Sequence, residues 1–379
     1  KLMISSGLVK LAGGDIAWRH LTALTFHYET QPLPTLLGWL MHQAPAWFHA
    51  ISTVLMFALE LLAPFCFFFP RNIRNTGIFS ILFFQILILL TGNYGFFNFL
   101  TMALCLTGLD DSVWQSMALK IKQFGTLRQK SAGESAGSSC GWKKPQNLSS
   151  EILTDTSLAS GSKKKCWSFF NILIIPVAVT FLLVSSNQIL RIVRMRLPWA
   201  APVAKMETLI SPLRTFNNYG LFAVMTTTRH EIFVEGSSDG KTWQAYEFKF
   251  KPGKLERIPF WIAQHQPRLD WQMWFAALSS ADDQPWFLNF CTRLLQGSPE
   301  VLGLLQNNPV PGVPPKYIRA GVYDYHFTTF DEWRRSGAWW KRDYLGVYLP
   351  PIALEKEGRG RMSEVRSRKS DLRPLTSDL

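Results

Sequence analysis

The chain has 379 residues, of which 47% are hydrophobic, 14% are aromatic and only 18% are charged. Its apolar residues are clustered in long runs, which is typical of a membrane protein that also carries a polar domain. The formal net charge is +13, but the excess lies beside the apolar runs and in the tails, where positive charge sets topology and meets membrane lipid. We therefore expect no nucleic acid partner.

The five cysteines show no spacing, to one another or to histidine, that matches a zinc site. Cys291 is the lone cysteine of the C-terminal region. Since it has no partner there for a disulfide, that region must be held together by its hydrophobic core. We expect neither a metal nor a cofactor.

Residues 15–46 form a segment rich in proline and aromatic residues, which we expect to lie at the membrane surface. The run Pro32-Leu33-Pro34 excludes one continuous helix here. Four of its side chains could in principle bind a metal or transfer protons: His20, His27, Glu29 and His42. Because their spacing matches no motif on a helix face, we expect them to form structural hydrogen bonds.

The first membrane span is predicted at residues 47–69, with Trp47 at one interface. Glu60 lies near the middle of this span, where an ionisable group is costly unless it is paired or protonated. It is therefore a candidate functional group. We prefer the alternative of a neutral Glu60 hydrogen-bonded to Gln85 or His49 across helices, since no neighbouring residues complete a catalytic set.

The second and third spans are predicted at residues 77–94 and 95–109. As a helix the former would span roughly 27 Å, close to the thickness of the bilayer core. The polar corner Thr91-Gly92-Asn93-Tyr94-Gly95 then turns the chain back. The run that follows is only about 21 Å long if helical, so it predicts a short span.

Residues 110–166 are rich in Ser, Gly and Lys and predict a flexible, basic linker. A fourth span follows at residues 167–186, with Pro176 expected to kink it. Arg71 and Arg74 should lie on the same side of the membrane as the linker lysines, because two spans separate them.

The positive-inside rule places these basic residues in the cytosol and everything after residue 186 in the lumen. The arginine cluster just beyond the fourth span argues for the opposite orientation, but large domains are translocated largely regardless of charge. On this topology the sequon at Asn147 stays unmodified, and a glycan there would invert the orientation.

Residues 187–351 predict a water-facing α+β domain, which a polar, disordered tail at 352–379 follows. Strand-like runs at 231–235 and 243–250 flank an Asp-Gly turn, which predicts a hairpin. Similar hairpins occur in β-sandwich modules, so a sandwich-like sheet is one arrangement that fits. The expected architecture is an α-helical multi-pass membrane domain followed by a luminal α+β domain.

Five long strings of the sequence are unusual: LTALTFHYETQPLPT, LTGNYGFFNFLT, NNYGLF, YEFKFKPG and RLDWQMWFAAL. Together they resemble the lipase maturation factor family, whose members are multi-pass proteins of the endoplasmic reticulum membrane. The resemblance covers residues 15–351, and family members carry additional sequence before Lys1, so we expect the N-terminus to be incomplete. The longer string HQPRLDWQMWFAAL is more similar to the second of the family's two vertebrate paralogues.

This resemblance implies a membrane-anchored chaperone that assists the folding, assembly and secretion of homodimeric lipases such as lipoprotein lipase. It implies neither a cofactor nor enzymatic turnover. No GxSxG, HExxH, P-loop or GxGxxG motif occurs in a fitting context. Asp270 has no nucleophile beside it and is placed to cap a helix over residues 271–280.

Aromatic residues of the C-terminal region are the candidates for client binding. Trp271, Trp274 and Phe275 recur at helical spacing, but a helix that is apolar all round is more often buried in a core. Exposed aromatic patches would instead capture unfolded segments of a client. The full set of candidates is Trp271, Trp274, Phe275, Trp286, Phe287, Trp339 and Trp340.

A multi-pass membrane enzyme that modifies luminal substrates is the alternative function, and it would use Glu60 and His27. The membrane portion has a loose similarity to vitamin K-dependent carboxylase. Loss of activity on a change at either residue, with client binding retained, would favour this alternative.

Overall fold

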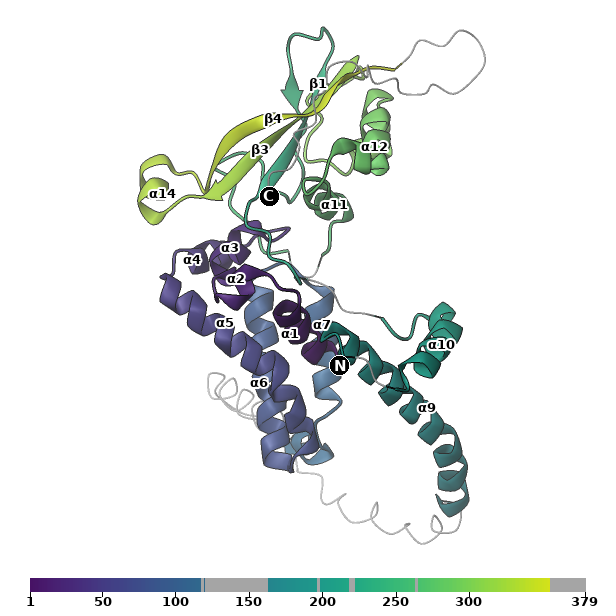
Figure 1. Cartoon of the computed structure of the whole chain (residues 1–379). Coiled ribbons are helices and arrows are strands. Elements are labelled where there is room, and N and C mark those ends of the chain that lie inside the picture. The colour runs from purple at the N-terminus through teal and green to yellow at the C-terminus, as the bar shows by residue number, and fades with distance from the viewer. Residues whose placement is uncertain (117–118, 120–162, 196–197, 218–221, 263–264, 355–379) are drawn as a thin grey trace, which may run out of the picture. The chain divides into compact units, whose positions relative to one another are not determined.

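The computed structural model describes the chain except for residues 117–118, 120–162, 196–197, 218–221, 263–264 and 355–379 (Figure 1). Most of the predicted linker and tail, with Asn147, lies outside the described residues. The chain divides into two compact units. One contains Lys1–Gly13, Glu60–Ile78 and Leu104–Ala223, and the other contains Gly14–Leu59, Phe79–Ala103 and Val224–Leu379.

The regular secondary structure described in unit 1 is entirely helical. It includes the last residues of α5, the first part of α6 and the end of α7. The fourth predicted span lies in α9, which runs through Pro176 as a helix of 30 residues. The elements are α1 (Leu2–Ala12), α5 (Ala46–Leu61), η1 (Ala63–Phe68), α6 (Arg71–Thr91), α7 (Phe96–Leu106), α9 (Lys163–Ile192), α10 (Ala200–Ile210) and η2 (Ser211–Leu213).

Among the described residues, three helical segments are long and apolar enough to cross a membrane: Ala46–Phe68, Arg71–Thr91 and Ile174–Ile192. They overlap the predicted first, second and fourth spans. The predicted third span contains α7, an apolar helix of only 11 residues. Its length follows from the corner before it and from the turn that begins after Leu106.

Unit 2 combines three short helices from the N-terminal part of the chain with the whole C-terminal sheet. It also includes most of α5, the second half of α6 and most of α7. Its remaining elements are α2 (Ile16–Arg19), α3 (Ala23–Thr30), α4 (Leu36–His42), β1 (His230–Ser237), β2 (Gln244–Ala245), α11 (Arg268–Ala276), η3 (Ala281–Asp283), α12 (Pro285–Leu295), α13 (Pro299–Leu302), β3 (Tyr317–Phe327), α14 (Phe330–Ser336) and β4 (Trp340–Ile352).

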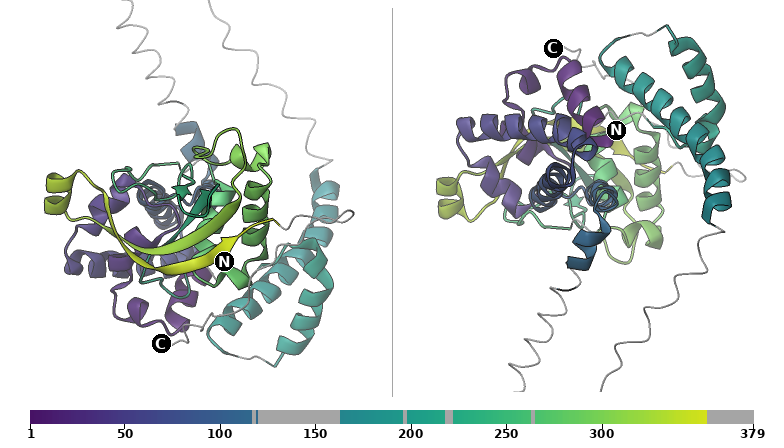
Figure 2. Two further views of the ribbon diagram at one scale, coloured as in Figure 1. Left: turned by 90° about the horizontal axis from the view of Figure 1, so that it is seen from above. Right: turned by 90° about the horizontal axis from the view of Figure 1, so that it is seen from below.

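The sheet has the order β2-β1-β3-β4, with all neighbours antiparallel. Its longest pair, β3 and β4, runs side by side as a curved band in the view from above (Figure 2, left). The described residues form this one sheet, with helices packed on it, and they contain no second sheet that would make a β-sandwich. An α+β fold is confirmed.

The predicted hairpin is present, but its second strand is shorter than expected. Glu235 pairs with Ala245 across a turn in which Gly240 has a φ of 73°. The Asp239 side chain accepts hydrogen bonds from the backbone N–H groups of Lys241 and Thr242, which lower the pKa of this carboxyl. Strand β2 ends at Ala245, and Tyr246 and Phe248, which follow it, are buried in the core.

Helix α12 covers one face of the sheet through a single apolar stripe. Phe287, Cys291 and Leu294 are all 0% exposed and recur at helical spacing. Pro285 begins the helix at a position where a missing N–H costs nothing. The core formed with α11 and the two central strands includes Ile232, Val234, Met273, Ala276, Ile318 and Ala320.

Asp270 does not cap α11, and that prediction was wrong. The helix begins at Arg268, so Asp270 lies inside its first turn. Its carboxylate accepts hydrogen bonds of 2.9 Å from the backbone N–H groups of Phe250 and Lys251. It therefore ties the segment after β2 to the helix, a long-range role that local capping rules do not detect.

Candidate functional site

A buried arginine joins β1 to the N-terminal segment within unit 2. Arg229 is 1% exposed, and its guanidinium donates to the carbonyl oxygens of Glu29 at 2.8 Å, Pro32 at 3.0 Å and Gln31. The two prolines at positions 32 and 34 keep this segment out of a helix, so its carbonyl groups are available as acceptors. One side chain thus fastens the loop between α3 and α4 to the sheet.

Arg229 also belongs to a buried set of three charges. Its Nη2 lies 2.6 Å from Glu231, whose other oxygen lies 2.7 Å from the Nζ of Lys251. The ring of Phe233 lies 5.0 Å from that Nζ and the ring of Trp340 lies 5.4 Å from the guanidinium carbon. Because every charge is paired and excluded from water, this cluster is suited to holding the fold rather than to binding a substrate.

The side chain of Glu29, one of the residues that could in principle bind a metal or transfer protons, lies beside this cluster. Its carboxylate accepts a 2.7 Å hydrogen bond from the N–H of Phe327 and lies 3.0 Å from His326 Nδ1. His42 Nε2 is 3.7 Å away, and burial lowers the pKa of His42. The structure therefore brings Glu29 and His42 together and adds His326, which the sequence did not single out.

His20 and His27 do not join this cluster. His20 follows α2, whereas the ring of His27 stacks on Tyr94 with 6.1 Å between ring centres. Among the described residues there is no group of three or more His, Cys, Asp or Glu side chains that could hold a metal ion.

The polar corner between α6 and α7 is the second point at which unit 2 is fastened together. Asn93 donates to the carbonyl oxygens of Leu33 at 2.9 Å and Phe260 at 2.8 Å, and accepts from the N–H of Ile262 at 2.7 Å. A Cβ added at Gly92 would lie 2.5 Å from the Tyr94 ring. The string recognised in the sequence is thus a structural joint that depends on the amide of Asn93 and on the missing side chain of Gly92.

Replacing Asn93 should weaken this joint in a graded manner. Asn93→Ala leaves two carbonyl groups and one N–H without their partner and should cost about 2 kcal/mol of unfolding free energy. Asn93→Asp should cost more, because a carboxylate would face the two carbonyl oxygens. Thermal unfolding in detergent checks this order, with Asn217→Ala at an exposed amide as control. Equal midpoints for Asn93→Ala and wild type would contradict it.

Glu60 is paired with a lysine, so the preferred hydrogen bond to Gln85 or His49 was wrong. Both oxygens of Glu60 lie 2.7 Å from Lys10 Nζ, and Ser6 Oγ lies 2.9 Å from one of them. Glu60 and Lys10 are each 5% exposed. The two residues are 50 positions apart on α1 and α5, and no local pattern in the sequence connects them.

Gln85 has a different partner from the one expected. Its side-chain oxygen accepts a 3.1 Å hydrogen bond from Asn98 of the neighbouring helix α7. Glu60 belongs to unit 1, whereas Gln85 and His27 belong to unit 2. The polar groups within the spans are therefore used in separate pairs, each joining helices of one unit.

Two of the proposed client-binding residues are buried and must be withdrawn. Phe287 is 0% and Trp340 is 1% exposed, because each packs in a core of the α+β region. Trp274 and Trp286 are half-buried, and their indole N–H groups donate to Thr30 O and Gln284 Oε1.

The other proposed client-binding residues are more accessible. Trp271 and Trp339 are half-buried, and Trp339 packs on Trp39 with 5.0 Å between ring centres. Phe275 is 49% exposed. It is the one member of the predicted set that is exposed rather than buried or half-buried.

Strand β4 carries the apolar residues most exposed on the sheet, and none of them was predicted from the sequence. Tyr344, Leu345 and Val347 are 58%, 49% and 61% exposed. No further strand pairs with β4 in the part of the chain that the structure describes. Its pairing with β3 shifts register beside Leu345, and such bulges re-aim side chains and are detected only in three dimensions.

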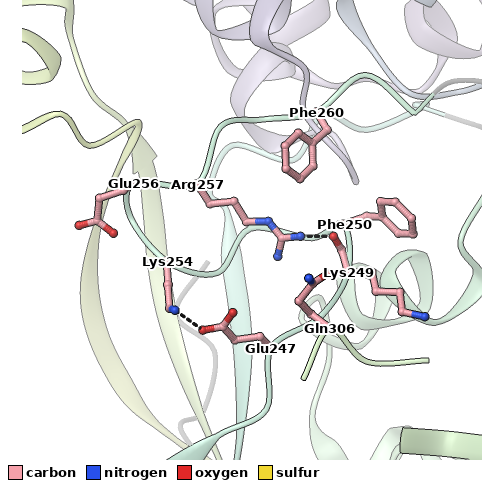
Figure 3. A pocket seen from close by; sticks show the side chains of 8 residues that line it. All are labelled: Glu247, Lys249, Phe250, Lys254, Glu256, Arg257, Phe260 and Gln306. Atoms are coloured by element: carbon pink, nitrogen blue, oxygen red, sulfur yellow. Dashed lines mark hydrogen bonds and ion pairs between the residues drawn. The ribbon is translucent and has the colours of Figure 1, made fainter. Parts of the chain in front are cut away.

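An open cavity of about 550 Å³ lies beside the segment after β2 (Figure 3). Most of its charged groups are already engaged: Arg257 donates to Phe248 O at 2.6 Å, Lys254 pairs with Glu247 at 2.9 Å, and Lys249 donates to Gly303 O. Burial lowers the pKa of Arg257. The lining therefore offers no unpaired cluster of charges that would define a ligand.

Two family models match the chain. The lipase maturation factor transmembrane domain matches residues 1–116, and the lipase maturation factor C-terminal domain matches residues 215–350. Lipase maturation factor 2 of Xenopus tropicalis is 34% identical over 93% of this chain, and that of Homo sapiens is 32% identical over 93%. Lipase maturation factor 1 of Mus musculus is 34% identical over 94%.

The chain spans 59% of the length of each of these relatives. No solved structure matches it. The first family model describes a transmembrane domain and covers two of the three apolar segments that are long enough to span, so the protein is a membrane protein. The relatives named lipase maturation factor 2 support the expected paralogue. The chain belongs to the lipase maturation factor family.

Proposed function

We propose that this protein is a multi-pass protein of the endoplasmic reticulum membrane that holds secretory clients while they fold. The clients would be homodimeric lipases of the lipoprotein lipase type, and the α+β region would face the lumen. The names of the relatives support a role in lipase maturation. In this orientation the basic residues Arg71 and Arg74 and the linker lysines face the cytosol, as the positive-inside rule requires.

The observation that carries the proposal is the exposed apolar edge of the sheet, formed by Tyr344, Leu345 and Val347 of β4. A sheet edge with exposed apolar side chains attracts extended segments of other chains. Here bulges interrupt the ladder, and charged residues precede the apolar ones. These features disfavour continuous backbone hydrogen bonding between β4 and a strand of another chain. A client segment would therefore bind mainly through contacts with the exposed side chains, and such contacts suit short-lived binding of varied unfolded segments.

Phe275 extends the proposal to α11. It is 49% exposed and packs edge-on against Trp274 with 5.0 Å between ring centres. Holding a client through such contacts until its own apolar surfaces are buried would suppress aggregation. No catalytic step is required, and we propose that the protein is not an enzyme.

The proposal is tested by replacing the β4 edge in full-length protein. In cells that lack the endogenous factor, Tyr344→Thr/Leu345→Thr/Val347→Thr should lower co-immunoprecipitation of newly made lipase about tenfold, which corresponds to roughly 1.4 kcal/mol of binding free energy. Threonine retains strand propensity. Secreted lipase activity should fall in parallel.

Val313→Thr is the matched control, since Val313 is 69% exposed but lies in a loop. It should leave both readouts unchanged. Normal association and secretion with the triple variant would show that the β4 edge does not hold clients. Restored secretion without any detectable association of the wild-type protein would contradict the chaperone proposal itself.

The alternative function, a multi-pass membrane enzyme that modifies luminal substrates, would use Glu60 and His27. Glu60 is instead engaged by Lys10 and Ser6, which provides a structural reason for its presence.

A further inference from the structure

The second half of α6 presents a continuous apolar stripe at its surface. Its members recur at intervals of three and four residues, so they lie on one face of the helix. The opposite face is packed, with Ile78 0%, Ile81 1% and Gln85 6% exposed. In a membrane span such a stripe faces lipid. The exposed residues are Phe79, Phe83, Ile86, Leu87 and Leu90, which are between 38% and 61% exposed.

A segment of the α+β region is fastened to the end of this helix. The indole N–H of Trp261 donates to Leu89 O at 2.8 Å, in the last turn of α6. On either side of Trp261, Phe260 O and Ile262 N bond to Asn93 in the corner that follows the helix. Residues 258–262 are therefore held at the level where α6 ends, and all of these groups belong to unit 2.

The apolar side chains of this fastened segment are about half exposed, and the Arg257 guanidinium carbon lies 5.3 Å from the centre of the Phe260 ring. Ile258 and Phe260 are each 44% exposed and Trp261 is 52% exposed. The polar atom of Trp261 is satisfied by the helix, so its exposed part is the apolar ring. Three exposed apolar side chains on a rigidly bonded segment are unfavourable in water. They match the preference of aromatic residues for the membrane–water interface at the ends of spans.

We propose that Ile258, Phe260 and Trp261 form a membrane-seating element that inserts into the interfacial layer of the bilayer beside the end of α6. The partner is the phospholipid surface itself. Contact with it would continue the lipid-facing stripe of α6 into the α+β region and fix that region against the membrane. This role is independent of the β4 edge and of the identity of any client.

Photo-crosslinking tests the seating element in full-length protein reconstituted into phosphatidylcholine nanodiscs. The probe is a phosphatidylcholine with a diazirine near the carbonyl end of one acyl chain, and adducts are mapped by mass spectrometry. Adducts are expected on residues 258–261 and on the α6 stripe. None are expected on residues 344–347 of β4, which are equally exposed and serve as the internal control.

The variant Ile258→Asn/Phe260→Asn should lower the adduct yield on Trp261 severalfold, with the thermal midpoint in detergent unchanged because both side chains are exposed. Its backbone bond to Asn93 is retained. Labelling of Phe83 without any adduct on residues 258–261 would overturn the proposal, as would equal labelling of residues 344–347.

Discussion

Arg229→Ala is expected to detach the N-terminal segment from the sheet and to cost about 3–5 kcal/mol of unfolding free energy. The truncation removes the donor for three carbonyl groups between Glu29 and Pro32 and leaves Glu231 with only Lys251 as its partner. These groups are buried, so water cannot replace the lost hydrogen bonds. The loop between α3 and α4 would lose its main attachment.

The expected result is a large fall of the thermal midpoint in detergent, together with new protease cleavage between α3 and α4. Arg229→Lys should recover only part of the stability, because the ammonium group of lysine cannot reproduce the planar set of N–H donors of the guanidinium. Arg319→Ala is the control, since its side chain is 40% exposed and pairs with Glu235 at the surface. It should cost less than about 1 kcal/mol. Equal effects of the Arg229 and Arg319 changes would show that the buried cluster does not hold the fold.

The sequence predicted the local features of the fold because local residue types cause them. The apolar runs predicted the spans, and the Asp-Gly turn predicted the hairpin at Gly240. The corner at Gly92 was recognised from its residue types. Its connection to residues 260–262 was not predicted, because Asn93 and Ile262 are separated by 169 positions.

The candidate site was harder to predict, because exposure is decided by packing over long distances. Phe287 and Phe275 both lie in aromatic-rich helices, yet one is 0% and the other 49% exposed. This difference in exposure depends on where each helix packs on the sheet, and it cannot be deduced from the residue type alone. The β4 edge was missed for the same reason, since an edge strand is defined by the strands that do not pair with it.

The polar residues within the spans show a third limit of prediction from the sequence. Glu60 was recognised as costly, but its partner Lys10 lies 50 positions away on another helix. Gln85 and Asn98 are separated by only 13 positions, on the two helices that the corner joins, and this pair was not predicted either. Apolar runs predict that a segment spans the membrane, but they do not predict which polar groups of two helices face one another.

A double-mutant cycle at Lys10 and Glu60 should show that this pair has a structural role. Glu60→Leu leaves the Lys10 ammonium in an apolar site, and Lys10→Met leaves the Glu60 carboxylate there, so each single change should cost about 3–5 kcal/mol. The double variant Lys10→Met/Glu60→Leu removes both charges and keeps apolar volume, so it should regain most of the stability. Thermal midpoints in detergent measure all four proteins.

Secreted lipase activity, measured in the same four proteins, separates structure from chemistry. If Glu60 serves only to join α1 and α5, activity should follow stability and return in the double variant. Gln85→Leu is the control for loss of an uncharged intramembrane pair, and it should cost only about 1 kcal/mol. A double variant that regains its stability yet matures no lipase would contradict the structural role, because the carboxylate would then be required for a step that packing cannot supply. That result would favour the membrane enzyme, whereas joint recovery leaves client holding as the function that the geometry supports.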